Sequence, residues 1–391
     1  MMSPEPLPIL IRGGKVYSPE PRGTQDLLIW GGKIALMREQ IDERDLERAL
    51  GRIEVIDAEE KLIVPGLIDQ HVHINGAGGE GGPLYRTPPV RAQDLLSSGI
   101  TTVVGLLGTD GITRSLRDLL MKARQLTLEG VTAYIYTGSY QVPSPTLTGS
   151  ISSDIILIEE VLGVKIALSD HRSSHPNKEE VLRIASEARV GGILSGKAGV
   201  VHVHMGEERT RFSILIEIAD ETDIPITQFA PTHVNRSREV LESSLEFGRR
   251  GGFLDVTTGV SKKSGFSRSV KPSEAIQFLL KNGISPYRIT MSSDGNGSMP
   301  EFDESGRLLR VLVSPVDSLL NELRDLVLVE GIKLEDALRF STANVAEHLM
   351  LKGKGKVERG YDADLLILDE NSLKPMAVIS QGELRFSTLK K

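Results

Sequence analysis

The chain has 391 residues, enough to bury a sizeable core, although a barrel of more than about 250 residues can be a single domain. Hydrophobic residues make up 39% and charged residues 25%, which is typical of a globular protein and excludes a disordered or membrane-embedded chain. The net charge of −7 and the scattered basic residues argue against a nucleic-acid partner, so we expect a small-molecule substrate.

The sequence has no recognisable signal peptide, no long apolar segment and no cysteine, and these features bear on localisation and redox chemistry. Residues 1–8 contain three prolines, one acid and no basic run, so they do not have the pattern of a secretory signal. No stretch approaches the ~20 apolar residues that cross a bilayer, and we therefore expect a cytoplasmic protein without membrane contact. Because the chain has no cysteine, histidine, carboxylates and lysine must carry any chemistry.

Short β-type runs separated by glycine turns mark both ends of the chain. We expect strands near 9–11, 27–30 and 34–37, and again near 364–368 and 377–380. These runs predict a small β-sandwich domain built from both chain ends. Its parts would be residues 1–64 and 353–391, and the central domain would span residues 65–352.

The central part alternates apolar strand-like runs with segments of helical period, as in βα units around a parallel sheet. The expected strands are 67–72, 101–106, 133–136, 164–168, 200–203, 224–227, 254–256 and 288–291. The expected helices include 115–128, 178–188, 212–219, 236–247 and 272–280. Eight strands with crossover helices predict a closed (β/α)8 barrel of the TIM type.

Five of the eight histidines lie at or just after predicted strand ends, where barrels collect catalytic residues. They are His71, His73, His202, His204 and His233. His71 and His73 are two residues apart on a strand, so both point to one face and can share a metal. The alternative is that they are polar residues satisfied by backbone groups.

The run from Val64 through Pro65, Gly66 and Asp69 to His73 resembles the opening of the barrel in the amidohydrolase superfamily. The resemblance implies a lysine at the end of strand four, histidines on strands five and six, and an aspartate on strand eight. The sequence supplies them in that order. The implied metal ligands are His71, His73, Lys165, His204, His233 and Asp294.

In the binuclear branch of this superfamily, carbon dioxide carbamylates the lysine to form a bridge between two metals, here implied to be two Zn²⁺ ions with the carbamate on Lys165. The amine must first be neutral, which burial favours by lowering its pKa. Asp294 is implied as ligand and general base toward the metal-bridging hydroxide. Its alternative role is a helix N-cap. His202 shares the strand face of His204, but His204 is nearer the strand end and fits the family position.

Further segments are similar to the isoaspartyl dipeptidases of this superfamily. They are residues 75–82, 108–109, 138–140, 169–173, 233–236 and 293–298. The resemblance implies hydrolysis of the β-aspartyl peptide bond in dipeptides by the bridging hydroxide. It also implies a homo-oligomer, specifically a homo-octamer.

The charges of a β-aspartyl dipeptide agree with this expectation. It carries two carboxylates and one α-ammonium, so its pocket needs two cations and one anion. Arg172, Arg236 and Glu80 supply that set on strand-end loops, although each alone is more often a solvated charge.

Four further residues are expected at the substrate. Gly78 lies in a glycine-rich loop whose backbone N–H groups can approach a carboxylate, although a flexible loop is the alternative. The phenol of Tyr140 is placed to donate to the oxyanion opposite the metal, unless it is simply a core residue. Thr109 and Ser298 are assigned hydrogen bonds to the substrate by resemblance.

Two other functions stay open. Hydantoinases and dihydroorotases share the same metal frame, so a cyclic-amide hydrolase is the main alternative. A non-catalytic scaffold barrel is the other, and the complete set of six ligands argues against it.

Overall fold

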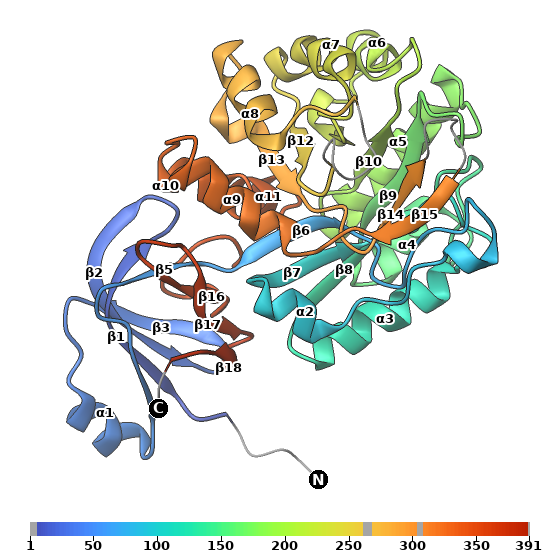
Figure 1. Cartoon of the computed structure of the whole chain (residues 1–391). Coiled ribbons are helices and arrows are strands. Elements are labelled where there is room, and N and C mark those ends of the chain that lie inside the picture. The colour runs from blue at the N-terminus through green and yellow to red at the C-terminus, as the bar shows by residue number, and fades with distance from the viewer. Residues whose placement is uncertain (1–5, 261–267, 303–307, 390–391) are drawn as a thin grey trace.

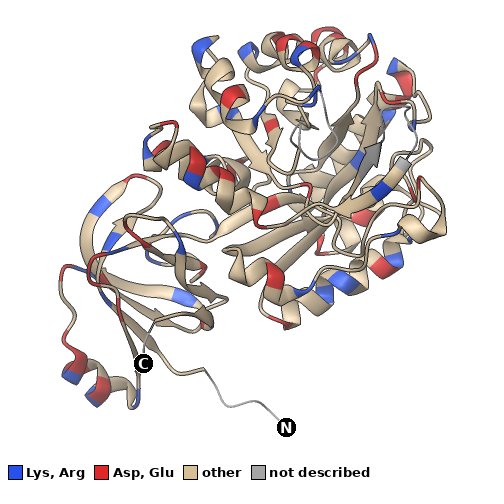
Figure 2. Cartoon of the chain, viewed as in Figure 1, with Lys and Arg blue, Asp and Glu red and all other residues tan. Residues whose placement is uncertain are grey.

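The computed structural model describes residues 6–260, 268–302 and 308–389. A barrel of strands and helices occupies the centre of the chain, and a β-domain that contains both chain ends packs beside it (Figure 1). In the described part of the chain, no helix is long and apolar enough to cross a membrane. Figure 2 shows acidic and basic residues interspersed along the outer helices.

The β-domain is one mixed sheet in the order β18-β17-β16-β5-β1-β2-β3, with β4 paired to β1. Its strands are β1 (Ile9–Tyr17), β2 (Pro21–Trp30), β3 (Lys33–Arg38), β4 (Glu54–Asp57), β5 (Lys61–Pro65), β16 (Leu365–Asp369), β17 (Pro375–Ser380) and β18 (Glu383–Ser387). The two chain ends meet where Ile63 of β5 pairs with Ile367 of β16. Both side chains are buried in the core of this domain. The predicted β-domain from both ends is confirmed.

The barrel contains eight strands in chain order. They are β6 (Leu67–Val72), β7 (Ile100–Gly105), β8 (Thr132–Gly138), β9 (Val161–Leu168), β10 (Val200–Met205), β11 (Phe229–Thr232), β12 (Leu254–Thr257) and β13 (Ile289–Ser292). β6 to β11 form a continuous parallel sheet, and β12 pairs with β13. A hydrogen bond from Val234 N to Asp255 O and a parallel bridge between Val72 and Gly295 link the two sheets. The predicted (β/α)8 barrel is confirmed.

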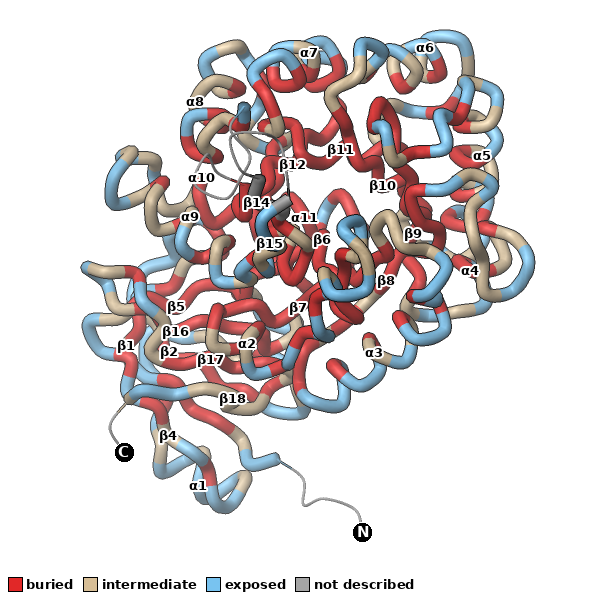
Figure 3. The backbone as a smooth tube through the Cα atoms, turned by 45° about the vertical axis from the view of Figure 1, so that its right-hand side comes forward, coloured by how far each residue is buried: buried red, intermediate tan, exposed pale blue. Residues whose placement is uncertain are grey.

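Helices surround the strands, with their outer faces exposed and the strands buried (Figure 3). They are α2 (Ala92–Ser97), α3 (Leu116–Leu128), α4 (Ile151–Leu157), α5 (Lys178–Ser195), α6 (Ser213–Glu221), α7 (Arg238–Arg249), α8 (Pro272–Lys281), α9 (Ser318–Leu328), α10 (Leu334–Arg339) and α11 (Ala343–His348). α1 (Glu43–Leu50) belongs to the β-domain. Ser115, Asn177 and Ser237 cap α3, α5 and α7 by accepting backbone N–H bonds.

The sixth barrel strand lies later than the sequence predicts. The prediction of 224–227 was wrong, because Pro225 starts the 3₁₀ turn η2 (Ile226–Gln228), and β11 follows at Phe229–Thr232. The Gln228 side chain donates to Gly199 O and fixes this turn against the start of β10. β11 contains Pro231, which argues against a strand at the sequence level. The shift brings the strand end directly to His233.

A short hairpin follows β13 and was not predicted. It consists of β14 (Ser298–Phe302) and β15 (Leu308–Val313), which pair antiparallel. A hydrogen bond from Ser314 N to Gly297 O closes the base of the hairpin. Ser298, a predicted substrate residue, is therefore the first residue of β14.

Candidate metal centre and active site

The first and last barrel strands bring two histidines to one aspartate. The Nε2 atoms of His71 and His73 each lie 3.3 Å from Asp294 Oδ1. A hydrogen bond from His73 N to Gly295 O joins the two strand ends. Asp294 has a φ of 52°, so it is not the N-cap of a helix, and its carboxylate faces the imidazoles.

His233 and His204 extend this cluster along neighbouring strand ends. The ligand atoms of His71, His233 and Asp294 all lie within 4.8 Å of one another. The rings of His204 and His233 meet edge to face with centroids 4.6 Å apart. Three of the predicted metal ligands therefore lie within the span of a metal site, and His204 contacts it.

Lys165 on β9 is fully buried, and its Nζ has no hydrogen-bond partner among the described residues. Burial lowers the pKa of this amine to about 7, with Arg172 adding to the effect while Asp294 and Asp255 oppose it. A neutral amine can react with carbon dioxide, so the environment of Lys165 fits the predicted carbamate.

The protonation states also suit a metal. Burial and then Lys165 lower the pKa of His71 to about 3. Burial likewise holds the pKa values of His204 and His233 well below the usual range. Burial alone would raise the pKa of Asp294, but His71 and His73 hold it well below its usual value. Neutral imidazoles beside an ionised carboxylate are the donor set of a divalent cation such as zinc.

Hydrogen bonds fix the orientation of His204. Its Nε2 lies 2.8 Å from Asp170 Oδ2, and its Nδ1 lies 2.6 Å from the Tyr140 hydroxyl. Burial opposes ionisation of Asp170, but hydrogen bonds from Arg172 and His204 hold its pKa far below the usual range. The Asp170 carboxylate therefore accepts a hydrogen bond from the Nε2–H group of His204. This tautomer leaves Nδ1 with a lone pair for a metal.

His233 is held in the same way from the opposite side. Its Nδ1 lies 2.7 Å from Thr257 Oγ1, at the end of β12. The backbone of Thr257 is fixed by two hydrogen bonds with the Asn235 side chain. If Nδ1 carries the proton, Nε2 is free to bind a metal.

Three predicted substrate residues from separate segments of the chain converge on Glu80. The Glu80 carboxylate lies 3.2 Å from Thr109 Oγ1, 3.4 Å from Ser298 Oγ and 3.5 Å from an Arg172 nitrogen. The hydroxyls and the guanidinium orient the carboxylate without coordinating the proposed metals. Glu80 is thus an anion held at the edge of the metal centre.

The two predicted arginines lie beside the candidate ligands. Arg172 makes two 2.9 Å hydrogen bonds to Asp170, and its guanidinium lies over the Tyr140 ring at 5.4 Å. An Arg236 nitrogen lies 3.1 Å from His204 Nε2. Arg172 therefore contacts Glu80, and Arg236 lies beside the same pair of His204 and Asp170 that Arg172 contacts.

Gly78 occupies a tightly packed position rather than a loose loop. It has a φ of 82°, and an added Cβ would lie 2.2 Å from Tyr85 O. Gly78 also forms a β-bridge with Arg86. Any side chain here would displace the loop that carries Glu80, so the glycine is needed for the shape of the pocket.

Comparison with known proteins shows the family of the chain. Residues 62–385 match the model of the Amidohydrolase family. The chain belongs to the amidohydrolase family.

Solved structures of other proteins are also similar to this amidohydrolase. A β-aspartyl dipeptidase from Fervidobacterium islandicum AW-1, in complex with β-Asp-Leu, is 43% identical with a TM-score of 0.88, covering 97% of both chains. The predicted resemblance to this group is confirmed. An L-hydantoinase (dihydropyrimidinase) from Arthrobacter aurescens is 17% identical with a TM-score of 0.68, covering 97% of this chain and 96% of that chain, and shows the fold alone.

A curated relative shares the family at lower identity. An adenine deaminase from Bacillus licheniformis is 25% identical over 320 residues, or 81% of this chain. This chain covers 48% of that protein, so it spans about half the length of this curated relative.

His202 contacts the candidate ligand His71 in this amidohydrolase. Its Nε2 lies 2.8 Å from His71 Nδ1, and its ring stacks on Tyr136 with centroids 4.7 Å apart. The geometry therefore supports His204 as the ligand of the fifth strand. His202 holds the His71 ring through its Nδ1 atom.

Two buried aspartates hold the strand ends and were missed as functional residues. Asp69 accepts hydrogen bonds from the backbone of His71 and from the backbone and hydroxyl of Ser293, and burial raises its pKa to about 7. It thus ties the first ligand strand to the residue before Asp294. Its place in the Pro65 to His73 run was the available signal.

Asp255 on β12 has a similar structural role. It accepts hydrogen bonds from the side chains of Gln70, Thr232, Thr290 and Ser292, which lie on three other strands. An aspartate inside an apolar strand was the only sequence signal. Such a residue needs partners, but the sequence does not say which.

Proposed function

We propose that the chain hydrolyses the β-aspartyl peptide bond of dipeptides with two zinc ions. The observation that carries the proposal is that one anion and two cations lie beside a metal donor set at the ends of the barrel strands. Glu80, Arg172 and Arg236 match the α-ammonium and two carboxylates of a β-aspartyl dipeptide. The 43% identity to a β-aspartyl dipeptidase in complex with β-Asp-Leu supports the same substrate class.

The residues present fit two divalent metals. Lys165 Nζ and Asp294 Oδ1 are buried without hydrogen-bond partners among the described residues, which is costly unless another group binds them. The ligands would be His71, His73, His204, His233, Asp294 and Lys165, the last as its carbamate. Bound zinc would supply a water of lowered pKa and polarise the scissile carbonyl.

Asp294 would move the proton during hydrolysis. Its carboxylate accepts a proton from the attacking water as the new C–O bond forms. It then delivers this proton to the leaving nitrogen as the C–N bond breaks, so that aspartate and a free amino acid are released. The low pKa of Asp294 keeps the carboxylate ionised at neutral pH, which a general base requires.

Tyr140 would stabilise the oxyanion. Burial raises the pKa of its phenol well above the usual value, so the hydroxyl remains a donor. The Tyr140 hydroxyl lies 2.6 Å from His204 Nδ1. When His204 binds a metal through Nδ1, the hydroxyl becomes available to the substrate.

Glu80, Arg172 and Arg236 would orient the dipeptide. Glu80 binds the α-ammonium, and the arginines bind the two carboxylates. Thr109 and Ser298 hold Glu80 and add hydrogen bonds to the polar ends of the substrate. Gly78 would present its backbone N–H to a substrate carboxylate.

A cyclic-amide hydrolase is the second candidate, because the barrel also resembles an L-hydantoinase. Hydantoins and dihydroorotate have no α-ammonium, so Glu80 would have no partner in their complexes. The predicted homo-octamer and cytoplasmic location remain proposals alongside the function.

The test is a substrate panel on metal-replete protein. We expect hydrolysis of β-Asp-Leu, with kcat/KM at least about 100-fold above that for hydantoin or dihydroorotate. Preference for a cyclic amide would favour the second candidate. A native preparation with no bound metal and no hydrolysis would instead favour a scaffold.

A further inference from the structure

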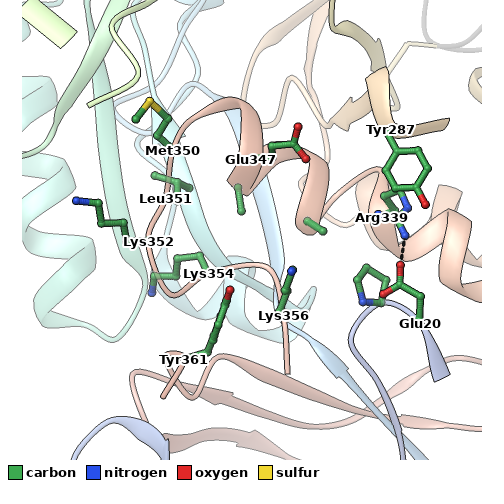
Figure 4. Close-up of a pocket in the computed structure, with 13 residues that line it drawn as sticks. Glu20, Tyr287, Arg339, Glu347, Met350, Leu351, Lys352, Lys354, Lys356 and Tyr361 are labelled. Carbon is green, nitrogen blue, oxygen red and sulfur yellow. Dashed lines mark hydrogen bonds and ion pairs between the residues drawn. The ribbon is translucent and has the colours of Figure 1, made fainter. Parts of the chain in front are cut away.

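A second cavity lies between the β-domain and the end of the barrel opposite the candidate metal centre. Its volume is about 550 Å³, within the usual range of small-molecule sites. Its walls come from the β1–β2 turn, η4 (Pro286–Arg288), α10, α11 and the loop from Met350 to Lys356 (Figure 4). Ser341 O, between α10 and α11, accepts a hydrogen bond from Ile68 N near the start of β6. The metal-site histidines follow the other end of that strand.

The acidic residues that line this cavity are already paired. Glu20 accepts a hydrogen bond from Arg339, whose guanidinium also stacks on Tyr287 at 4.2 Å. Glu347 pairs with Arg288 at 3.3 Å. The lining therefore contains no carboxylate left to balance its lysines.

One of the three lysines is also accounted for. Lys354 is buried and pairs with Asp362 at 3.0 Å and with Asp364. It also donates to Thr132 Oγ1 at 2.9 Å, at the start of β8. Lys354 thus has a structural role, tying the loop to both domains.

The other two lysines have no such partners. Neither Lys352 nor Lys356 forms a hydrogen bond or ion pair with any described residue, and the same holds for the Tyr361 hydroxyl. Lys356 is half-buried, and Figure 4 shows its ammonium and the Tyr361 hydroxyl both rising toward α11. Two uncompensated ammonium groups at one cavity stand out in a chain of net charge −7.

The backbone holds these donors in place. Gly353 and Gly355 alternate with the lysines and have φ angles of 74° and 78°. An added Cβ at Gly355 would lie 2.9 Å from Thr342 O, before α11. The loop is therefore packed against the barrel, which reduces the entropy lost when a ligand binds.

We propose that this cavity binds a small dianion, either a phosphate group or a dicarboxylate, through Lys356 and Tyr361. Lys352 is exposed and directed away from them in Figure 4, so it adds positive charge at a longer distance. The ammonium groups supply charge, and the phenol supplies a neutral donor. The cavity is lined by both domains, so a bound anion stabilises their junction. This site is separate from the proposed hydrolytic site and does not depend on that function.

Calorimetric titration of the full metal-loaded protein with phosphate, and separately with succinate, tests the site. All samples are held at one ionic strength with no free metal. We expect a one-site isotherm and a saturable rise in Tm for at least one anion. The preferred anion identifies which of the two chemistries the site takes. Absence of binding by both anions would overturn the proposal.

Variants locate the binding. Lys356→Gln and the double variant Lys352→Ala/Lys356→Ala should weaken binding at least about tenfold. The control is Lys281→Ala, which removes an exposed lysine at the end of α8 and should bind like the wild type. The conservative Lys356→Gln keeps most of the side chain, so it reports on binding even if the double variant folds poorly.

The active-site arginines are the competing location for an anion. Binding that persists in Lys356→Gln and in the double variant but is lost in Arg236→Ala would place the anion at the hydrolytic site. That result would overturn the proposal. Unchanged binding in all three variants would overturn it as well.

Discussion

The burial of Lys165 determines the protonation state of its amine. Its amine lies on an apolar strand without a partner among the described residues, and burial lowers its pKa to about 7. Around pH 8 most of the amine is therefore neutral, as carbamylation requires. A lysine kept only for packing would not need a site beside four histidines and a carboxylate.

Lys165→Ala should lower hydrolysis and zinc content together, with zinc affinity reduced by more than about 100-fold. Added formate or acetate should restore part of both, because a short carboxylate can replace the carbamate oxygens. Zinc analysis with and without the additive measures this. Full activity of Lys165→Ala without any additive would show that the bridge is misassigned.

His202 is expected to support metal binding without touching the metal. When His71 Nε2 binds zinc, its Nδ1 must carry the proton and donate to His202 Nε2, 2.8 Å away. His202→Leu removes the acceptor and should weaken zinc binding about 10–100-fold. His202→Gln retains an acceptor and should recover part of the affinity.

Zinc competition with a chromophoric chelator measures these affinities directly. Melting of the metal-free variants separates a loss of fold from a loss of metal. Equal zinc affinity in His202→Leu and the wild type would refute the supporting role.

Glu80→Gln should damage turnover of β-Asp-Leu far more than metal binding. Removing one partner of a desolvated charge pair costs ~2–5 kcal/mol, which lowers kcat/KM by a factor of tens to thousands. Because Glu80 contacts Thr109, Ser298 and Arg172 but no candidate ligand, zinc content should not change.

Glu208→Gln is the matched control for this experiment. It removes a charge from another strand-end loop, where Glu208 pairs with His175 at 3.0 Å. Its kcat/KM should match the wild type. A metal-replete Glu80→Gln protein with unchanged kcat/KM on β-Asp-Leu would remove the main support for a dipeptide substrate.

The sequence indicated the candidate ligands but not the residues that support them. The spacing of His71 and His73 and the order of Lys165, His204 and His233 place these residues at strand ends. The partners that fix the rings come from other strands and cannot be read from spacing. Asp170 behind His204 and Thr257 behind His233 became visible only in the fold.

At the scale of elements, long periodic segments were predicted well and local turns were not. The predicted helix of 115–128 corresponds closely to α3, whose buried face repeats along the segment. β11 was displaced because the 3₁₀ turn after Pro225 and the proline within the strand depend on packing against β10. The β14–β15 hairpin was also missed; its two strands pair with each other in a separate small sheet.

α9 offers a test of electrostatics away from the site. Burial and then Asp325 raise the pKa of Glu322 to about 7 from its usual 4.5, while Lys271 opposes the shift. The raised folded pKa means that the folded state favours the protonated carboxyl. Below about pH 4.5 the Glu322 carboxyl is protonated in both the folded and unfolded states and does not reduce stability. As the pH rises from there to about 7, it reduces the stability of the folded state progressively more.

Glu322→Gln removes this cost. The gain in unfolding free energy of Glu322→Gln over the wild type should be larger at pH 8 than at pH 5, by on the order of 1–2 kcal/mol. Urea unfolding at both pH values measures the difference. The control is Glu274→Gln, an exposed glutamate on α8. A stability difference that does not depend on pH would contradict the buried-carboxyl account.

On the scale of the whole molecule, the two chain ends and the barrel form a single scaffold for two separate sites. β5 leads directly into β6, so the β-domain sheet adjoins the strand that carries His71. The composition of the ends predicted that they share a sheet. The boundaries at 64/65 and 352/353 stay predictions, as does the octamer, which light scattering would test.

The central claim is that this barrel cleaves the β-linked isomer of an aspartyl dipeptide with bound metal. The most direct test compares the initial rates of β-Asp-Leu and α-Asp-Leu hydrolysis, with metal content measured on the same sample. We predict about two zinc ions per chain and a kcat/KM at least about 100-fold higher for β-Asp-Leu. Equal rates on the two isomers, or full activity with one metal ion or none, would contradict the account.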